Sequence, residues 1–159
     1  MTKLSKIGRF LGFFLVISFT QAETNPASLA ARQWREAHER AIIDEYFQLL
    51  SIPNIATDQV NIRRNADMIV DMLKKRGVAS RLVEAPDVNP VVFGEIRTPG
   101  ATRTIVFYAH YDGQPLDPKE WATPPFTPVI KDDRIYARSA SDDKAPIIAI
   151  LAALDSGEA

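Results

Sequence analysis

The residues of this chain that could do chemistry lie in two short stretches, one around His110 and one around Asp142. An apolar run, residues 105–109, ends at His110, and Asp112 follows two positions later. In an extended strand, residues i and i+2 project to the same face, so the Asp112 carboxylate can reach the His110 imidazole. A histidine that binds a metal usually donates its second ring N–H to a carboxylate or carbonyl. The pattern therefore predicts a hydrolytic metal site at the end of a buried strand.

Each of these residues also has an ordinary structural interpretation. A single histidine at a strand end is more often hydrogen-bonded or exposed than a metal ligand, and His-x-Asp is a short pattern. Ser141, Asp142 and Asp143 precede an apolar helical stretch, where serine and aspartate are favoured N-caps and aspartate suits the helix dipole. Pro146 fits the start of a helix, and Lys144 fits a solvated side chain. Taken alone, the aspartates are better explained as caps.

Composition narrows the classes of function. The chain has 159 residues, of which 46% are hydrophobic and 25% charged, and these values are ordinary for one soluble globular domain. It contains no cysteine, which excludes disulfides, cysteine zinc sites and thiol catalysis. Any metal must therefore be held by histidine and carboxylate side chains.

Residues 1–22 have the layout of a secretory signal peptide. Three basic side chains precede an apolar stretch from Phe10 to Phe19, and Thr20-Gln21-Ala22 offers a small-residue cleavage site. The stretch is shorter than the ~20 residues that span a bilayer. We therefore expect export, to a periplasm or out of the cell, with no stable membrane anchor after cleavage; an uncleaved anchor is the alternative. Removing the three basic groups takes the formal charge from −1 to −4, so we expect no nucleic-acid partner.

Helices are predicted where apolar residues recur at helical spacing. Three segments meet this criterion, residues 29–50, 58–76 and about 144–154. Residues 23–28 are expected to form a short flexible leader before the first helix. Asp58 is the expected N-cap of the second helix, and Gly77 is its expected stop.

Strands are predicted where β-branched and aromatic residues cluster between turn signals. These segments are residues 78–84, 91–96, 104–109, 129–130 and 134–137. Pro99-Gly100 predicts a hairpin between the second and third segments, and Lys131-Asp132-Asp133 predicts another between the last two. The third segment is the most apolar and is expected to be a buried strand. The order of elements favours an α/β fold with a mixed, largely parallel sheet flanked by helices.

Three longer motifs resemble one enzyme family. They are His110-Tyr111-Asp112-Gly113-Gln114-Pro115-Leu116-Asp117-Pro118, Glu120-Trp121-Ala122-Thr123-Pro124-Pro125-Phe126-Thr127-Pro128 and Tyr136-Ala137-Arg138-Ser139-Ala140-Ser141-Asp142-Asp143-Lys144. Together they resemble the M20 family of metallopeptidases, and the proline-rich loop is most similar to the dipeptidase and carnosinase-like branch. The resemblance runs from about Tyr46 to Ala159.

The resemblance implies roles for the residues singled out above. His110 matches a ligand of one metal in a two-zinc centre, Asp112 matches the carboxylate that orients it, and Asp142 matches the carboxylate that bridges the metals. Zinc or a similar divalent ion is the implied cofactor, and a dipeptide or short peptide is the implied substrate. Metals ~3.5–4 Å apart can share a nucleophilic water and polarise the scissile carbonyl.

The chain also departs from the family pattern. Ala137, Ser139 and Ala145 stand where the second motif usually has glycines. Nothing matches the family's glutamate general base, its further ligands or its smaller domain, without which a homodimer is not expected. Only His38 and His110 are present as histidines, and His38 has charged neighbours. We therefore expect no turnover from the 159-residue chain alone.

The sequence is best interpreted as the N-terminal part of an exported, zinc-dependent M20-type peptidase. The expected organisation is a signal peptide over residues 1–22, a leader and first helix over 23–45, and part of the catalytic domain over 46–159. One alternative is a non-catalytic α/β remnant or binding module. Another, within enzymes, is a deacylase of N-acyl amino acids.

Overall fold

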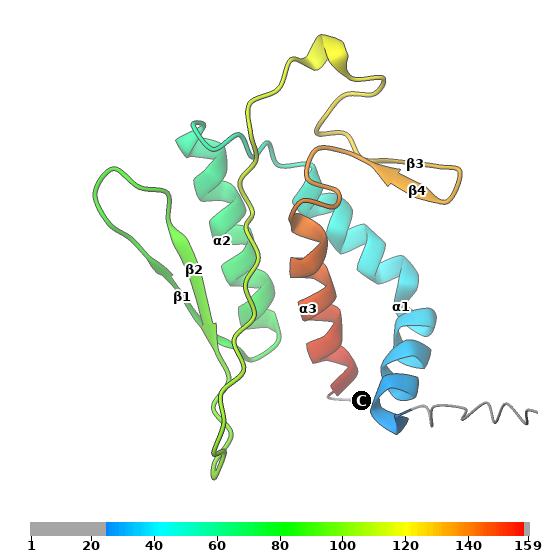
Figure 1. Cartoon of the computed structure of the whole chain (residues 1–159), viewed down its shortest axis with the longest axis vertical. Coiled ribbons are helices and arrows are strands. Elements are labelled where there is room, and N and C mark those ends of the chain that lie inside the picture. Colours follow the sequence, from blue (N-terminus) through cyan, green and yellow to red (C-terminus); the bar gives the residue numbers. More distant parts are fainter. Residues whose placement is uncertain (1–24, 158–159) are drawn as a thin grey trace, which may run out of the picture.

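The computed structural model describes residues 25–157 (Figure 1). The predicted signal peptide lies outside the described residues. The elements, in chain order, are α1 (Pro26–Leu50), α2 (Gln59–Lys75), β1 (Ala79–Val83), β2 (Val91–Glu95), the short 3₁₀ helix η1 (Pro118–Glu120), β3 (Val129–Lys131), β4 (Arg134–Tyr136) and α3 (Lys144–Gly157). None of the helices in this part of the chain has the length and hydropathy of a transmembrane span.

The helices begin and end where local sequence signals place them. Asp58 caps α2, because its side chain accepts a hydrogen bond from the backbone N–H of Asn61 at 3.1 Å. Gly77 follows α2 with a φ of +70°, the left-handed conformation that glycine adopts readily. The leader prediction is wrong for residues 26–28, because Asn25 caps α1 and the helix starts at Pro26.

The core lies where the three helices meet. Helix α1 packs against α3, whereas α2 packs against β1 and β2 (Figure 1). The buried residues that join the helices are Tyr46, Leu49, Leu50, Ile69, Met72, Ala137, Ile147, Ile148 and Leu151. The first three come from the last turns of α1, so this end of the helix is packed into the core.

The two sheets are small antiparallel hairpins. The predicted hairpin of β3 and β4 is confirmed, and Asp132 and Asp133 form its turn with φ values of 51° and 56°, as a type I′ turn requires. The other predicted hairpin is wrong, because β2 pairs with β1 and not with residues 104–109. Ala79 lies opposite Glu95 in that register.

Residues 104–109 are extended but form no strand, contrary to the prediction (Figure 1). Ile105, Val106, Phe107 and Tyr108 are 78%, 84%, 70% and 82% exposed. The apolar composition marks residues suited to a buried strand, but a strand also needs a neighbour to pair with, and residues 25–157 supply none. Parallel pairing in the same range is confined to one bridge, between Ile55 and Gly113. The largely parallel sheet is therefore not present in the described part.

Candidate metal centre

His110 stands at the end of the extended segment and has polar contacts at both ring nitrogens and at its backbone N–H. Its Nδ1 lies 3.0 Å from the carbonyl oxygen of Asp112 and 3.3 Å from Oδ1 of the same residue. Its Nε2 lies 2.9 Å from Oδ1 of Asp142. Its backbone N–H donates to Oδ2 of Asp143 at 3.2 Å. The structure thus brings together the three predicted site residues and adds a fourth, Asp143.

These neighbours define where the imidazole carries its protons. Nδ1 faces a carbonyl oxygen, which can only accept, so Nδ1 is protonated. Nε2 faces the Asp142 carboxylate, which accepts a hydrogen bond from Nε2 when the ring carries a second proton. Burial alone disfavours the imidazolium, but the Asp112 carbonyl and the carboxylates of Asp142 and Asp112 outweigh burial and raise the pKa of His110. A metal at Nε2 would take the place of this second proton while the Nδ1–H bond stays in place.

The two aspartates face His110 and not the helix that follows them. Asp142 and Asp143 lie in the loop before α3 and are joined by a cis peptide bond. The side chain of Asp142 is 87% exposed. Within residues 25–157, their side-chain hydrogen bonds run to His110 and not to the first amides of α3. Capping therefore does not explain these residues, although their types alone favoured it.

Lys144 is not the solvated side chain that its type suggested. It is fully buried, and its Nζ donates to the carbonyl oxygens of Leu49 at 2.8 Å and Ile52 at 3.1 Å. Burial lowers its pKa to about 7. A signal was available, since Lys144, Ile147 and Leu151 share one face of a helix by spacing. The lysine thus joins the start of α3 to the end of α1.

Asn54 is a second buried polar residue near the site that was not predicted from the sequence. It lies just after α1, is fully buried, and its Nδ2 donates to the carbonyl oxygen of Tyr111 and to Oγ of Ser139, both at 2.8 Å. One acceptor lies between His110 and Asp112 in sequence. Asparagine after a helix is a common turn residue, so type and position alone did not distinguish it.

The donors present fit part of a zinc site. Imidazole nitrogen and carboxylate oxygen are ligands that zinc accepts. The Nδ1 atom of His110 contacts the carbonyl of Asp112, as is expected of a histidine whose other ring nitrogen binds a metal. A zinc site normally takes three or four protein donors, and residues 25–157 contain no group of three or more candidate side chains placed to hold an ion. His38 lies elsewhere, exposed on α1 and bonded to the carbonyl oxygen of Trp34 at 2.8 Å. His110 and Asp142 are thus an incomplete donor set.

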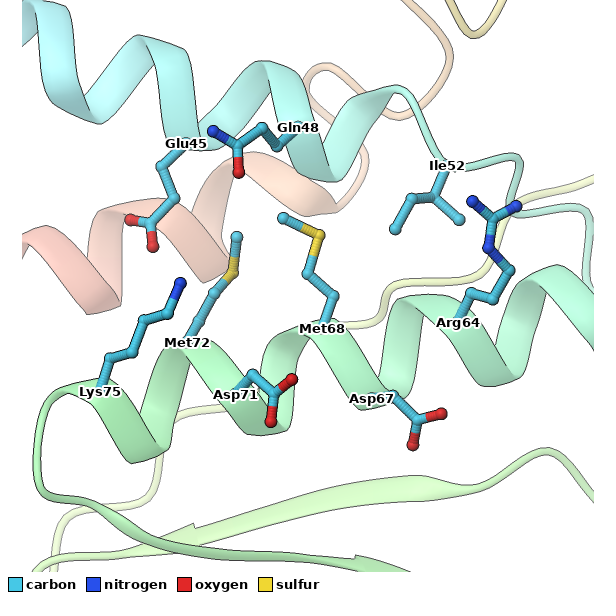
Figure 2. Close-up of a pocket in the computed structure, with 9 residues that line it drawn as sticks. All are labelled: Glu45, Gln48, Ile52, Arg64, Asp67, Met68, Asp71, Met72 and Lys75. Atoms are coloured by element: carbon cyan, nitrogen blue, oxygen red, sulfur yellow. The ribbon is translucent and has the colours of Figure 1, made fainter.

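A hollow of about 340 Å³ lies between α1 and α2 and is separate from His110 (Figure 2). Met68 and Met72 line it together with charged side chains such as Glu45, Asp71 and Lys75. No residue of the candidate metal centre lines it. The hollow therefore does not provide the substrate cleft that a peptidase would need.

Comparison with known proteins gives the same class as the motifs. Residues 106–158 match the model of peptidase family M20/M25/M40. The Cys-Gly metallodipeptidase of Schizosaccharomyces pombe is 28% identical over 121 residues, which are 67% of this chain and 25% of that protein. The succinyl-diaminopimelate desuccinylase of Acidovorax ebreus is 50% identical over 56 residues, which are 35% of this chain and 14% of that protein.

The fold agrees with these matches. The dipeptidase Dug1p of Saccharomyces cerevisiae superposes with a TM-score of 0.74 at 20% identity, over 82% of this chain and 31% of that one. This places the described residues in an α/β peptidase fold. The chain is thus a relative of the M20 peptidases, a family of metal-dependent hydrolases, and the resemblance seen in the motifs is confirmed. It spans about a quarter of the length of the S. pombe relative.

Proposed function

We propose that this chain is the N-terminal part of an exported, zinc-dependent M20-type peptidase that hydrolyses dipeptides or short peptides. The observation that carries the proposal is the 2.9 Å approach of His110 Nε2 to Asp142 Oδ1, with Asp112 on the other ring nitrogen. This is the relation expected of two ligands around one position and a carboxylate that orients the histidine. The S. pombe relative, named as a metallodipeptidase, supports the substrate class.

The residues present would contribute binding and orientation. His110 and Asp142 would hold zinc, and when bound zinc would polarise the amide carbonyl and activate water. Asp112 would keep the proton on Nδ1, leaving Nε2 free to coordinate. The buried contacts of the neighbouring segments would keep the ligands in place, as a metal site requires.

We propose that the remaining donors, the general base and the partners of a larger sheet come from sequence beyond residues 25–157. The exposed apolar run at residues 105–108 supports this, because it has the composition of a buried strand. The incomplete donor set supports it as well. The 159-residue chain alone would then bind zinc weakly and have no peptidase activity.

Zinc binding by the 159-residue chain tests the ligand assignment, because the chain has only two histidines. Isothermal titration calorimetry should give weak binding that His110→Ala removes and that His38→Ala, the matched control, leaves unchanged. Equal loss in both variants, or none in either, would contradict the assignment. Chelator-sensitive dipeptide hydrolysis by the purified chain would contradict the predicted inactivity.

The intact mass of the protein from its natural source tests the remaining parts of the proposal. A mass well above 17.7 kDa supports the longer peptidase, and an N-terminus at Glu23 supports cleavage and export. A mass equal to the chain without residues 1–22 would favour the non-catalytic remnant or binding module.

A second candidate is a deacylase of N-acyl amino acids. The desuccinylase match, 50% identical over 56 residues, favours it. An assay of the natural protein on an N-succinyl amino acid and on a dipeptide distinguishes the two. Faster hydrolysis of the N-succinyl amino acid than of the dipeptide would select the deacylase.

A further inference from the structure

We infer that Asn54 is a positioning residue that sets the distance between the His110 segment and the Asp142 loop. The inference rests on the proposed function in one respect only, that the purpose of this distance is to bring two metal ligands together. The bonds themselves do not depend on a metal. Asn54 contacts neither His110 nor Asp142 directly, so any role in the site acts through the backbone and the loop.

The amide of Asn54 joins two segments that are distant in sequence. Its Nδ2 donates at 2.8 Å to the carbonyl of Tyr111, the residue between His110 and Asp112. The same nitrogen donates at 2.8 Å to Oγ of Ser139, three residues before Asp142. One planar group therefore fixes both acceptors in relation to each other, and thereby the two sides of the candidate centre.

The backbone of Asn54 reinforces the first of these contacts. Its carbonyl accepts from the N–H of Gly113 at 2.7 Å, and Ala56 N–H donates to the Gly113 carbonyl at 2.9 Å. Gly113 leaves little room beside the amide, because a Cβ there would lie 3.3 Å from Nδ2 of Asn54 and 3.3 Å from Oγ of Ser139. These backbone bonds thus hold Gly113, just after the His110 segment, against Asn54, whose side chain bonds Ser139 in the Asp142 loop.

Neighbouring contacts hold the rest of the loop to the same end of α1. Tyr46 donates its hydroxyl to the carbonyl of Ala140, and Lys144 donates to the carbonyls of Leu49 and Ile52. These bonds anchor the loop on α1 but do not reach the His110 segment. The Asn54 amide, in contrast, is bonded to both the loop and the His110 segment.

The chemistry of the position explains why asparagine is needed. A buried carbonyl and a hydroxyl both accept from Nδ2, and only an amide nitrogen of this size offers two donors at that point. Aspartate has the same shape but loses this donor, and its charge would face the Tyr111 carbonyl in a buried place. Asn54→Asp therefore removes the link with a minimal change of volume.

Asn65 provides a matched control. It is also fully buried, and its Nδ2 also donates to two acceptors at 2.8 Å, the carbonyls of Pro53 and Asn61. It does not contact Tyr111 or Ser139. Asn65→Asp thus carries the same chemical change and a comparable loss of stability without breaking the link between the two segments.

Amide hydrogen exchange of the 159-residue chain tests the inference without a metal. In Asn54→Asp, exchange at Gly113 N–H and His110 N–H should be at least tenfold faster than in Asn65→Asp, after both are referred to the slowest amides of α1, which carries neither substitution. Ser139→Ala, a milder change that keeps the amide, should show the same pattern to a smaller extent. Equal exchange at these sites in both Asp variants would overturn the inference, and so would unchanged exchange in Ser139→Ala if Asn54→Asp fails to fold.

Zinc affinity separates this inference from the proposed function. If the wild-type chain binds zinc through His110, Ser139→Ala and Asn54→Asp should weaken binding several-fold, and Asn65→Asp should not. Equal affinity in all folded variants would overturn the positioning role and leave the proposed function standing. Absence of zinc binding by the wild type would overturn the proposed ligands, and the exchange pattern would then decide the positioning role alone.

Discussion

Lys144 Nζ lies 2.8 Å from the carbonyl oxygen of Leu49, so the first residue of α3 provides a donor for the last turn of α1. The final carbonyls of a helix have no partner within the helix and need one from elsewhere. Lys144 supplies it for Leu49, and for Ile52 just beyond the helix, from a fully buried position. This contact brings the loop that carries Asp142 onto the end of α1.

Lys144→Met should lower the free energy of unfolding. The carbonyl of Ile52 would lose its donor, and that of Leu49 would keep only the longer bond from the N–H of Ile52 at 3.4 Å. An unpaired buried group costs about 1–3 kcal/mol. Removing a buried amine recovers part of this, so we expect a net loss of about 1–3 kcal/mol in urea unfolding. Lys119→Met, at an exposed lysine, should change stability by less than about 0.5 kcal/mol. A Lys144→Met variant as stable as the wild type would contradict the anchoring role.

Arg76→Met should be more destabilising than loss of an exposed arginine. Arg76 follows α2 and pairs with Glu45 of α1 at 2.7 Å and Asp155 of α3 at 2.8 Å, and its side chain is only 13% exposed. Its removal leaves two carboxylates facing each other without a cation, for which we expect a loss of about 2–4 kcal/mol in urea unfolding. The ion triad thus ties together the three helices at the end opposite His110.

Arg63→Met is the matched control for Arg76. Arg63 also pairs with two carboxylates, Asp67 and Glu84, but its side chain is 49% exposed. Exposed ion pairs contribute little and are screened by salt. A loss in Arg63→Met as large as that in Arg76→Met would show that burial does not govern these pairs.

The helices could be predicted because their signals are local. Asp58 and Gly77 delimit α2 by their own conformational preferences, and the face of α3 follows from spacing. The β3–β4 hairpin was predictable for the same reason, since Asp132-Asp133 suits its turn. The pairing of β2 was not, because the Pro99-Gly100 turn signal says that the chain turns but does not say which strand becomes the neighbour.

The candidate site was predictable in part for the same physical reason. The approach of Asp112 to His110 follows from two positions of sequence separation. The approach of Asp142 to His110 spans 32 residues and was indicated by the family resemblance and not by spacing. Lys144 and Asn54 donate to backbone carbonyls, which every residue possesses, and Asn54 donates in addition to the hydroxyl of Ser139, 85 residues away in sequence. The sequence therefore does not identify these partners.

Tyr46 should make stability fall at alkaline pH. Burial raises the pKa of its hydroxyl to about 12 from the ordinary 10.0. The folded state therefore keeps a proton that the unfolded state has lost, so the stabilisation is complete below pH 10 and is lost as pH rises towards 12. The loss from this group is roughly 2 kcal/mol at pH 12. In urea unfolding, Tyr46→Phe should be less stable below pH 10 but show a shallower fall above it, and parallel curves would contradict this assignment.

Val106→Lys should reduce self-association of the chain without lowering its stability. Val106 is 84% exposed in an extended segment with no strand partner among residues 25–157. Such a segment presents apolar side chains and free backbone groups to other chains, and a lysine on an edge opposes that pairing. Sedimentation velocity should show fewer oligomers than the wild type, whereas Val60→Lys, at a 73% exposed valine on α2, should have no effect. Equal oligomer content in both variants would mean that residues 104–109 do not mediate association. The apolar run would then not be explained as a strand that lacks a pairing partner.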